Sequence, residues 1–429
     1  MKTGCDINLR YIYTFILFLL LPLTLIRLSV LMLGYPGYRS RWMQRLGLYS
    51  DANLGSPAIW VHAVSVGEVE AAVQLIKAIK IKYPDHRVVI TTVTPTGAET
   101  VVTRFSDQIR HYYLPYDLPY AVKSFLRHIR PVAGVIMETE IWPNLYHHAD
   151  ATDIPILLVN ARISDASFKG YMRIKRLTRE TLCKTKLVAS QSILDGERFL
   201  ALGCEKDKLK VVDNLKYDLE VKKDLREQAE ILKRDYFSGR PVWIAASTHE
   251  GEEELALSVH KKLLSNNREA VLIIAPRHPQ RFERVHGICM ENDFKVTRKS
   301  ASDRFTQEMK VFLLDSLGDL PLYYAVANLA FVGGSLVQVG GHNLLEPASV
   351  ETTIITGPHT FNFKDVVEKL RSADALYTVA DEAELEEKVL SMFASPERAK
   401  LMSDNALRVL EENRGGTNQT LELISEHIN

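Results

Sequence analysis

The stretch Phe331-Val-Gly-Gly-Ser-Leu-Val-Gln-Val-Gly-Gly-His-Asn-Leu-Leu-Glu-Pro347 shows how this chain folds. It begins inside an apolar run that starts at Leu329, and such a run is typical of a buried strand. Gly333-Gly334-Ser335 then allows the backbone to turn where a side chain would clash. After a second glycine pair, Asn343 is a good N-cap and predicts that a helix begins at the next residue. The pattern is a strand, a glycine-rich turn and a helix.

This turn is also a candidate binding site. A glycine turn leaves backbone N–H groups facing an anion, and a helix N-terminus attracts one. Glu346 falls in the first turn of the predicted helix, where the dipole favours an acid and a carboxylate can accept hydrogen bonds from a ribose. The spacing fits neither a P-loop nor a GxGxxG fingerprint. An ordinary glycine-rich connection remains the alternative.

The strand–loop–helix pattern repeats on both sides of a charge-rich segment at residues 220–240, which we interpret as a linker. Alternating strands and helices predict parallel sheets covered on both faces, with ligands beyond the carboxyl ends of the strands. The predicted strands are residues 58–63, 87–93, 132–137, 154–159 and 186–190, then 242–247, 271–275, 311–315, 329–332 and 353–356.

We therefore predict an α/β protein with two Rossmann-like domains, residues 35–219 and 241–429, facing across a cleft. The last helices, from about Glu382 onward, are candidates to cross back over the first domain.

The composition excludes several classes of protein. Lys+Arg and Asp+Glu both number 53 among 429 residues, so no global field attracts nucleic acid. The four cysteines, Cys5, Cys183, Cys204 and Cys289, contain no CxxC pair and are interpreted as reduced thiols of a cytosolic body. The histidines show no ligand spacing, so we predict no metal site.

The N-terminus predicts a membrane anchor over residues 1–34. Tyr11 to Ile26 carries no charge and Leu28 to Leu33 continues after Arg27, a run short for a bilayer span. The segment 34–38 is a poor signal-peptide cleavage site. Tyrosines, a tryptophan and arginines between residues 35 and 45 suit the cytoplasmic membrane interface. A cleaved signal peptide and a helix buried in the protein are the alternatives to an uncleaved anchor.

Three glutamates follow predicted strands of the first domain. Glu68 either caps a helix against Ser65 or acts as a general base. Glu138 and Glu140 lie directly after an apolar strand, where two close carboxylates require polar partners. One of this pair is interpreted as structural.

Two cations are further candidates. Arg277 lies between prolines after a predicted strand, and its guanidinium suits phosphate oxygens, with a surface salt bridge as the alternative. Lys216 lies near the domain junction and by itself carries no signal, since a lone lysine is usually solvated.

Taken together, the motifs resemble those of the 3-deoxy-D-manno-octulosonic acid (Kdo) transferases of lipopolysaccharide assembly. The resemblance covers nearly the whole chain, and each motif is modest alone but specific in this order. The motifs are Ser65–Glu68, Met137–Asn144, Asn214–Lys216, Ala275–Pro279 and Gly340–Pro347.

The resemblance implies a GT-B fold and an inverting, metal-independent transfer of Kdo from CMP-Kdo to a lipid A precursor, lipid IVA. It implies that Glu68 activates the acceptor hydroxyl and that Glu138 and Lys216 stabilise the transition state. No cofactor is implied beyond the donor substrate. The residues implied to hold CMP are Pro276, Arg277, Leu317, Gly318, Asp319, Asn343, Leu344, Leu345 and Glu346.

The anchor then fits an acceptor that stays in the inner membrane, with the catalytic domains on the cytoplasmic side. Another GT-B enzyme, such as a lipid glycosyltransferase or an epimerase, and a non-catalytic membrane-bound nucleotide sensor are the other hypotheses. An epimerase would need no anchor, and a sensor would not require Glu68. The motifs do not distinguish how many Kdo units are transferred or the oligomeric state.

Overall fold

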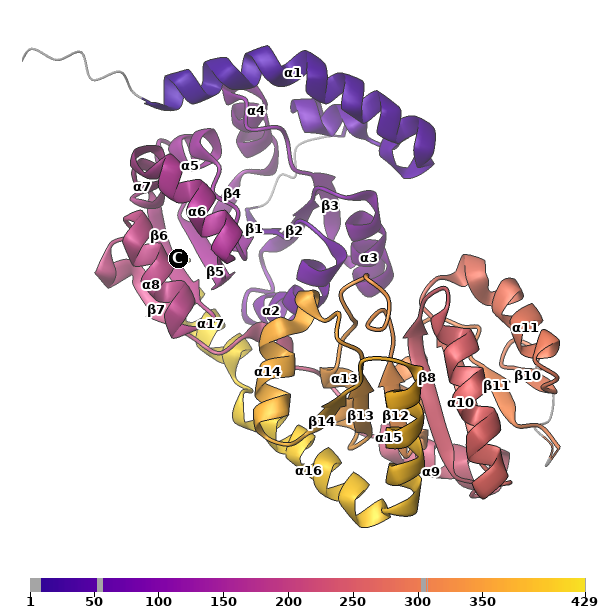
Figure 1. Ribbon diagram of the computed structural model, residues 1–429. Helices are drawn as coiled ribbons and strands as arrows, with labels where there is room; N and C mark the ends of the chain where they lie inside the picture. Colours follow the sequence, from indigo (N-terminus) through magenta and orange to yellow (C-terminus); the bar gives the residue numbers. More distant parts are fainter. Residues whose placement is uncertain (1–8, 52–56, 302–305, 307, 429) are drawn as a thin grey trace, which may run out of the picture. The chain divides into compact units, whose positions relative to one another are not determined.

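The computed structural model describes residues 9–51, 57–301, 306 and 308–428. They form two compact units, which we call the N-terminal unit and the C-terminal unit (Figure 1). The N-terminal unit holds the chain up to Asp218 together with residues from Arg414 onward, and the C-terminal unit is Leu219–Asn413. Of the four cysteines, Cys5 lies outside the described residues, and Cys183, Cys204 and Cys289 are free thiols.

The N-terminal unit is built on a seven-stranded parallel sheet in the order β3-β2-β1-β4-β5-β6-β7. The inner strands β1 and β5 are fully buried, and β2, β4 and β6 are buried except at one residue near their start, because helices cover both faces, as expected for crossover connections. The strands are β1 (Ala58–His62), β2 (Arg87–Thr92), β3 (Arg110–Tyr113), β4 (Pro131–Met137), β5 (Ile156–Ala161), β6 (Thr185–Ser190) and β7 (Leu209–Val211).

Two apolar clusters, one on each face of this sheet, form the core of the unit. The helices are α1 (Leu9–Gly34), α2 (Val66–Lys82), α3 (Pro95–Phe105), α4 (Pro119–Ile129), α5 (Pro143–Asp150), α6 (Asp165–Arg173), α7 (Lys175–Leu182), α8 (Ile193–Leu202) and α17 (Gly416–Ser425). Short helical turns are η1 (Pro36–Arg39), η2 (Trp42–Leu46), η3 (Ser106–Gln108), η4 (Lys206–Lys208) and η5 (Leu215–Tyr217).

The C-terminal unit repeats this architecture with a second seven-stranded parallel sheet, in the order β10-β11-β9-β8-β12-β13-β14. Its strands are β8 (Val242–Thr248), β9 (Val271–Pro276), β10 (Val296–Arg298), β11 (Val311–Leu313), β12 (Leu329–Val332), β13 (Thr353–Thr356) and β14 (Leu376–Thr378).

Helices again cover the sheet on both faces. They are α9 (Leu225–Ile231), α10 (Glu252–Asn266), α11 (Phe282–Glu291), α12 (Leu320–Val326), α13 (Leu345–Ser349), α14 (Lys364–Ser372), α15 (Glu382–Ala394) and α16 (Pro396–Glu412). The short turns are the π-helical η6 (Leu232–Tyr236), η7 (Pro279–Arg281) and η8 (Phe361–Phe363).

The predicted α/β class with parallel sheets is confirmed. Two segments differ in detail from the expected division of the chain. Residues 220–240, expected as a linker, contribute α9 to the C-terminal unit, where Leu225 and Ala229 join the core beside α12. Of the last helices, α15 and α16 belong to the C-terminal unit, and α17 belongs to the N-terminal unit, where Ile424 packs in the core.

Candidate active site

Each sheet reverses its strand order beside the first strand of its unit. In the N-terminal unit β1 lies between β2 and β4, and in the C-terminal unit β8 lies between β9 and β12. In open parallel sheets, ligands bind beyond the carboxyl ends of the strands at such a reversal. The loops after β1 and β4, and those after β8 and β12, are therefore the positions where a site is expected.

Glu68 lies in the first turn of α2, directly after β1. Its carboxylate accepts hydrogen bonds from the Val64 N–H at 2.8 Å and from the Ser65 hydroxyl at 3.4 Å, so it does cap the turn. Burial, followed by the negative charge of Glu138, raises the pKa of Glu68 to about 8, although the Val64 N–H opposes the shift. A carboxyl group with a pKa this close to neutrality can accept a proton from a substrate and release it again.

Glu138 follows β4 and lies between two cations. Its Oε1 is 3.6 Å from the Lys216 ammonium and its Oε2 is 3.5 Å from the Arg162 Nε. Glu138 has a φ of 56°, a left-handed conformation that is uncommon for a residue with a side chain. The structure thus brings Glu68, Glu138 and Lys216 together, with Arg162 as a fourth charged member.

Arg162 was not selected as a site residue from the sequence. Its position in the sequence could have identified it, since Arg162 directly follows β5, the strand that pairs with β4. The carboxyl ends of neighbouring parallel strands lie at the same edge of the sheet, so residues after β4 and β5 are expected to be close.

Glu140 has mainly structural partners. It accepts a hydrogen bond from the Trp142 indole at 2.7 Å, and its carbonyl accepts one from the Tyr146 hydroxyl. The fully buried His62 holds its Nε2 at 3.8 Å from the Glu140 carboxylate, while its Nδ1 contacts the Thr91 hydroxyl at 2.8 Å. These contacts fit the expectation that one glutamate of the pair supports the loop.

Two hydrogen bonds hold the backbone of the turn that carries Lys216. The Asn160 side chain, fully buried near the end of β5, accepts a hydrogen bond from the Leu215 N–H at 3.1 Å. The Asn214 side chain accepts one from the Lys216 N–H at 3.0 Å. Both bonds fix the short turn η5, and thereby bring a lysine distant in sequence beside Glu138.

In the C-terminal unit, the glycine-rich turn after β12 differs from the sequence-based expectation. The fully buried Glu252 carboxylate accepts hydrogen bonds from the N–H groups of Gly334, Ser335 and Leu336 at 2.7 to 3.0 Å, and from that of His249 at 2.9 Å. A side chain on Gly333 would clash with this carboxylate, which explains the glycine. These N–H groups face an internal carboxylate instead of the bound ligand that the sequence suggested, and the carboxylate already occupies them.

The second glycine pair and the helix start are also satisfied internally. The N–H groups of Gly340 and Gly341 both donate to the Gly334 carbonyl. The Asn343 side chain accepts a hydrogen bond from the Leu345 N–H at 3.0 Å and donates to Glu346 at 3.2 Å. The N–H groups of Gly340, Gly341 and Leu345 are therefore already hydrogen-bonded within the protein.

Arg277, after β9, lies near three histidines: its neighbour His278, and His249 and His342, which follow β8 and β12. His249 and His342 stack with their Nε2 atoms 2.9 Å apart, and His278 meets His249 edge to face. Burial, followed by the positive charge of Arg277, lowers the pKa of His342 to about 3. The pKa of His249 is lowered mainly by burial, and that of His278 by burial and then by Arg277. Among the described residues, the Arg277 side chain has no carboxylate partner.

The remaining donor-site candidates have different surroundings. Asp319 forms an ion pair with Lys299 and accepts a hydrogen bond from the Ser316 hydroxyl at 2.6 Å. Gly318 has a φ of 89°, and Leu317 is exposed beside it. Pro276 ends β9, and Leu344 and Leu345 are buried.

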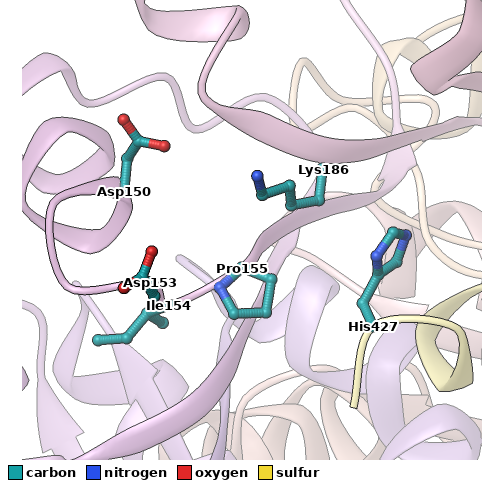
Figure 2. Close-up of a pocket in the computed structure, with 6 residues that line it drawn as sticks. All are labelled: Asp150, Asp153, Ile154, Pro155, Lys186 and His427. Atoms are coloured by element: carbon teal, nitrogen blue, oxygen red, sulfur yellow. The ribbon is translucent and has the colours of Figure 1, made fainter. Parts of the chain in front are cut away.

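A pocket also opens at the opposite edge of the N-terminal sheet (Figure 2). Its lining comes from segments before β5, at the start of β6 and after α17, whereas Glu68 and Glu138 follow the carboxyl ends of their strands. We therefore do not assign it to the candidate active site. The lining residues are Asp150, Asp153, Ile154, Pro155, Lys186 and His427. Within the part of the chain that the structure describes, no group of three or more His, Cys, Asp or Glu side chains is arranged to hold a metal ion.

Two parallel α/β units, each with a strand reversal beside its first strand, are the architecture of the GT-B fold. A UDP-N-acetylglucosamine 2-epimerase of known structure is similar over 87% of this chain and 96% of that chain, with a TM-score of 0.56. At 13% sequence identity this similarity concerns the fold alone. The predicted GT-B class is confirmed.

The sequence comparisons are more specific. The family described as 3-deoxy-D-manno-octulosonic-acid transferase (kdotransferase) matches residues 40–219. The chain is 38% identical to the 3-deoxy-D-manno-octulosonic acid transferase of Haemophilus influenzae, over 98% of this chain and 99% of that protein. It is 34% identical to the transferase of the same name from Bordetella pertussis, over 90% of each.

The chain belongs to the Kdo transferase family and is a glycosyltransferase. The predicted resemblance and the predicted transfer of Kdo in lipopolysaccharide core assembly are thereby confirmed.

Proposed function

We propose that the protein transfers Kdo from CMP-Kdo to a lipid A precursor, lipid IVA, with inversion at the sugar carbon. The observation that carries the proposal is the cluster of Glu68, Glu138 and Lys216 at the strand reversal of the N-terminal unit. A single displacement by a hydroxyl group requires a base that removes the hydroxyl proton and groups that stabilise the charge on the leaving phosphate.

Glu68 is the proposed general base. In its ionised form it removes the proton from an acceptor hydroxyl as the hydroxyl oxygen attacks the anomeric carbon of Kdo. The bond from that carbon to the CMP phosphate breaks, and CMP leaves with the bonding electrons as a phosphate monoester. The raised pKa of Glu68 makes its ionised form a stronger base than an exposed carboxylate.

Glu138 and Lys216 are the proposed transition-state stabilisers. Lys216 supplies positive charge, and Glu138 holds the ammonium group in place together with the turn fixed by Asn160. A fixed cation stabilises the growing negative charge without reorganising at the moment of reaction.

The C-terminal unit is the proposed site of the donor nucleotide. Arg277 is the residue proposed to bind the phosphate, because it carries a positive charge beside neutral imidazoles. The family resemblance adds Pro276, the loop from Leu317 to Asp319, and the segment from Asn343 to Glu346 as the surroundings of CMP.

We further propose that α1 holds the enzyme at the inner membrane, with both units on the cytoplasmic side. α1 is the one helix of the described residues that is long and apolar enough to enter a bilayer. A membrane-held enzyme fits an acceptor that remains in the bilayer.

The test of the function is CMP release from CMP-Kdo, measured with and without lipid IVA, with the lipid product identified by mass. We expect CMP release only with the lipid acceptor, and a product heavier by one or more Kdo residues. Rapid CMP release without acceptor, or an epimerised donor, would overturn the proposal. Tight CMP binding with no turnover on lipid IVA would favour the nucleotide-sensor alternative.

A further inference from the structure

Helix α1 has two opposite faces. The residues at positions 10, 14, 17, 21, 24 and 28 are buried or half-buried, which is the i, i+4, i+7 spacing of one helical face. The opposite face is apolar and exposed by between 61% and 78% at each position. It consists of Phe15, Leu19, Leu23, Ile26, Val30 and Leu33.

The start of α1 is bound to the N-terminal unit by a buried polar cluster. The Arg10 guanidinium and the Thr14 hydroxyl both donate to the Asn144 side-chain oxygen, at 2.9 and 3.0 Å. Asn144 in turn donates to the Asp117 carbonyl at 2.7 Å. The Asp117 carboxylate accepts from the N–H groups of Asn144 and Leu145, which begin α5.

The segment after α1 is bound to the same unit. The Arg45 guanidinium donates to the Val93 carbonyl at 2.7 Å, and Arg41 donates to the His111 carbonyl at 2.7 Å. Between the two ends, the Phe18 ring meets Tyr120 of α4 at 6.5 Å, and Leu28 is buried (Figure 1 shows α1 beside α4).

A helix of 26 residues is about 39 Å long, and a helix that crosses a bilayer places its two ends on opposite sides of about 30 Å of hydrocarbon. The start of α1 and the segment that follows it are both bound to the N-terminal unit, so crossing would require breaking one of these attachments. We propose that α1 lies along the membrane surface, with its exposed apolar face in the lipid and its buried face on the protein, and does not cross the bilayer. The inference rests on the membrane location proposed above.

The charges beside α1 favour an anionic bilayer as the occupant of the apolar face. On α4, the exposed Tyr120 is followed at helical spacing by the exposed Lys123 and Arg127, and the exposed Arg130 comes directly after the helix. In the described part of the chain none of these cations pairs with a carboxylate. Cations beside an exposed apolar helix face are the pattern of a helix held at a lipid surface with acidic headgroups.

The buried polar cluster that binds the start of α1 is close in sequence to the loop that carries Glu138. Asn144 lies in the first turn of α5, and Glu138 and Glu140 lie in the loop that connects β4 to α5. If α1 lies in the plane of the membrane, it holds the loop between β4 and α5 near the lipid surface. A lipid acceptor can then reach the proposed active site without leaving the bilayer.

The first experiment is a topology measurement on the full-length protein in bacterial membranes. Epitope tags are added before Met1 and after Asn429, and each is probed with an impermeant protease in spheroplasts and in inverted inner-membrane vesicles. We expect both tags to be cleaved only in inverted vesicles. Cleavage of the N-terminal tag in spheroplasts would show a crossing helix and overturn the inference.

The second experiment measures depth. Spin labels are attached at Phe15→Cys and Val30→Cys in protein whose Cys5 and Cys183 are replaced by serine, and bound to vesicles with one third phosphatidylglycerol. An in-plane helix gives equal depths at the two positions, whereas a crossing helix separates them by about 22 Å. Protein that does not float with these vesicles, or that buries the labels in a lipid-free dimer, also contradicts the proposal.

A matched pair of variants tests the docking cluster. Thr14→Val removes a bond to Asn144, whereas Ser29→Ala removes a hydroxyl that donates only to the helix's own Leu25 carbonyl. The double variant Arg10→Gln/Thr14→Val should make the two label depths unequal. The control variant Ser29→Ala should leave them equal. Equal depths in the double variant would show that the cluster does not hold α1.

Transfer to detergent-dispersed lipid IVA is measured on the same preparations. Activity with a crossing α1 overturns only this inference, and an in-plane α1 without activity overturns only the proposed function.

Discussion

The two units share one topology, yet their strand reversals carry opposite chemistry. Beyond β1 and β4, carboxylates lie beside the cations Lys216 and Arg162, and Glu68 is kept largely protonated near pH 7. Beyond β8 and β12, the Glu252 carboxylate accepts hydrogen bonds from backbone N–H groups. Neutral histidines there lie near the positive charge of Arg277. The first arrangement can move a proton, and the second can bind an anion.

The difference shows how one fold separates two tasks. A buried carboxylate that is fully hydrogen-bonded serves as a structural part, because its charge is already compensated. A carboxylate that is buried near other carboxylates instead has a raised pKa and becomes reactive. The number of N–H donors around each glutamate decides which of these it becomes.

The largest expected effect is the loss of the proposed base. Glu68→Gln should lower kcat by about 100- to 10,000-fold, since a general base contributes that much. CMP binding should not change, because the nucleotide is assigned to the other unit. Steady-state kinetics and CMP titration check both. As a control, Glu70→Gln alters a neighbour whose partner is the exposed Arg104, and near-normal turnover of Glu68→Gln would leave Glu68 as a helix cap only.

The next effect concerns the cation beside Glu138. Lys216→Ala should lower kcat by roughly two to three decades, the value of one fixed donor to a developing negative charge, while KM for CMP-Kdo changes less. Lys208→Ala, which removes a lysine paired with Glu205 in the same unit, serves as the control. If Lys216→Ala lost donor affinity and kept kcat, Lys216 would be a binding residue.

A smaller effect is expected at Arg277. Arg277→Ala should weaken CMP binding by about 10- to 100-fold, the range of a hydrogen bond to a charged group, and should lower kcat less than Lys216→Ala does. Calorimetric titration with CMP measures this directly. Arg284→Ala, which removes an exposed arginine paired with Glu250 in the same unit, should bind CMP normally. Unchanged CMP affinity in Arg277→Ala would remove this residue from the phosphate site.

The pH dependence of stability should differ in sign between the units. Glu68 has a folded pKa of about 8 against an ordinary value of 4.5, so folding takes up a proton between these pH values. Its cost to stability is absent below pH 4.5 and complete above pH 8. Glu68→Gln should therefore raise Tm at pH 9 and leave it unchanged at pH 4. A stabilisation that did not grow with pH would contradict the raised pKa.

His342 should act in the other direction. Its folded pKa of about 3 lies below the ordinary 6.5, so the unfolded chain binds the proton first and stability falls as the pH drops below 6.5. Replacing His342 by glutamine should flatten this loss between pH 6.5 and 3 in hydrogen exchange of the C-terminal unit. An unchanged pH profile would show that His342 is not held neutral.

The smallest expected effect is that of chelation. Turnover should persist in excess EDTA, because fixed cations and donors are proposed to meet the charge of the leaving CMP. The measurement is CMP release before and after chelator, with magnesium added back as the control. Activity lost in EDTA and restored by magnesium would contradict a metal-independent transfer.

The sequence by itself determined the two parallel sheets, since the strand–loop–helix alternation is a local pattern of apolar residues and glycines. It missed the short edge strands β3, β7, β10 and β14, which span three or four residues and show no clear period. It also selected Glu68, Glu138, Lys216 and Arg277, because a motif can be recognised without knowing what the residues contact.

Only the tertiary structure decided how these residues are used. Lys216 reaches Glu138 through a turn fixed by the buried Asn160, and no sequence spacing shows that bond. The glycine turn was expected to bind an anion, but Glu252, about 80 residues earlier in the chain, occupies its N–H groups. Such contacts join residues far apart in sequence, and a carboxylate's pKa and partners depend on burial and neighbours that exist only in the folded chain.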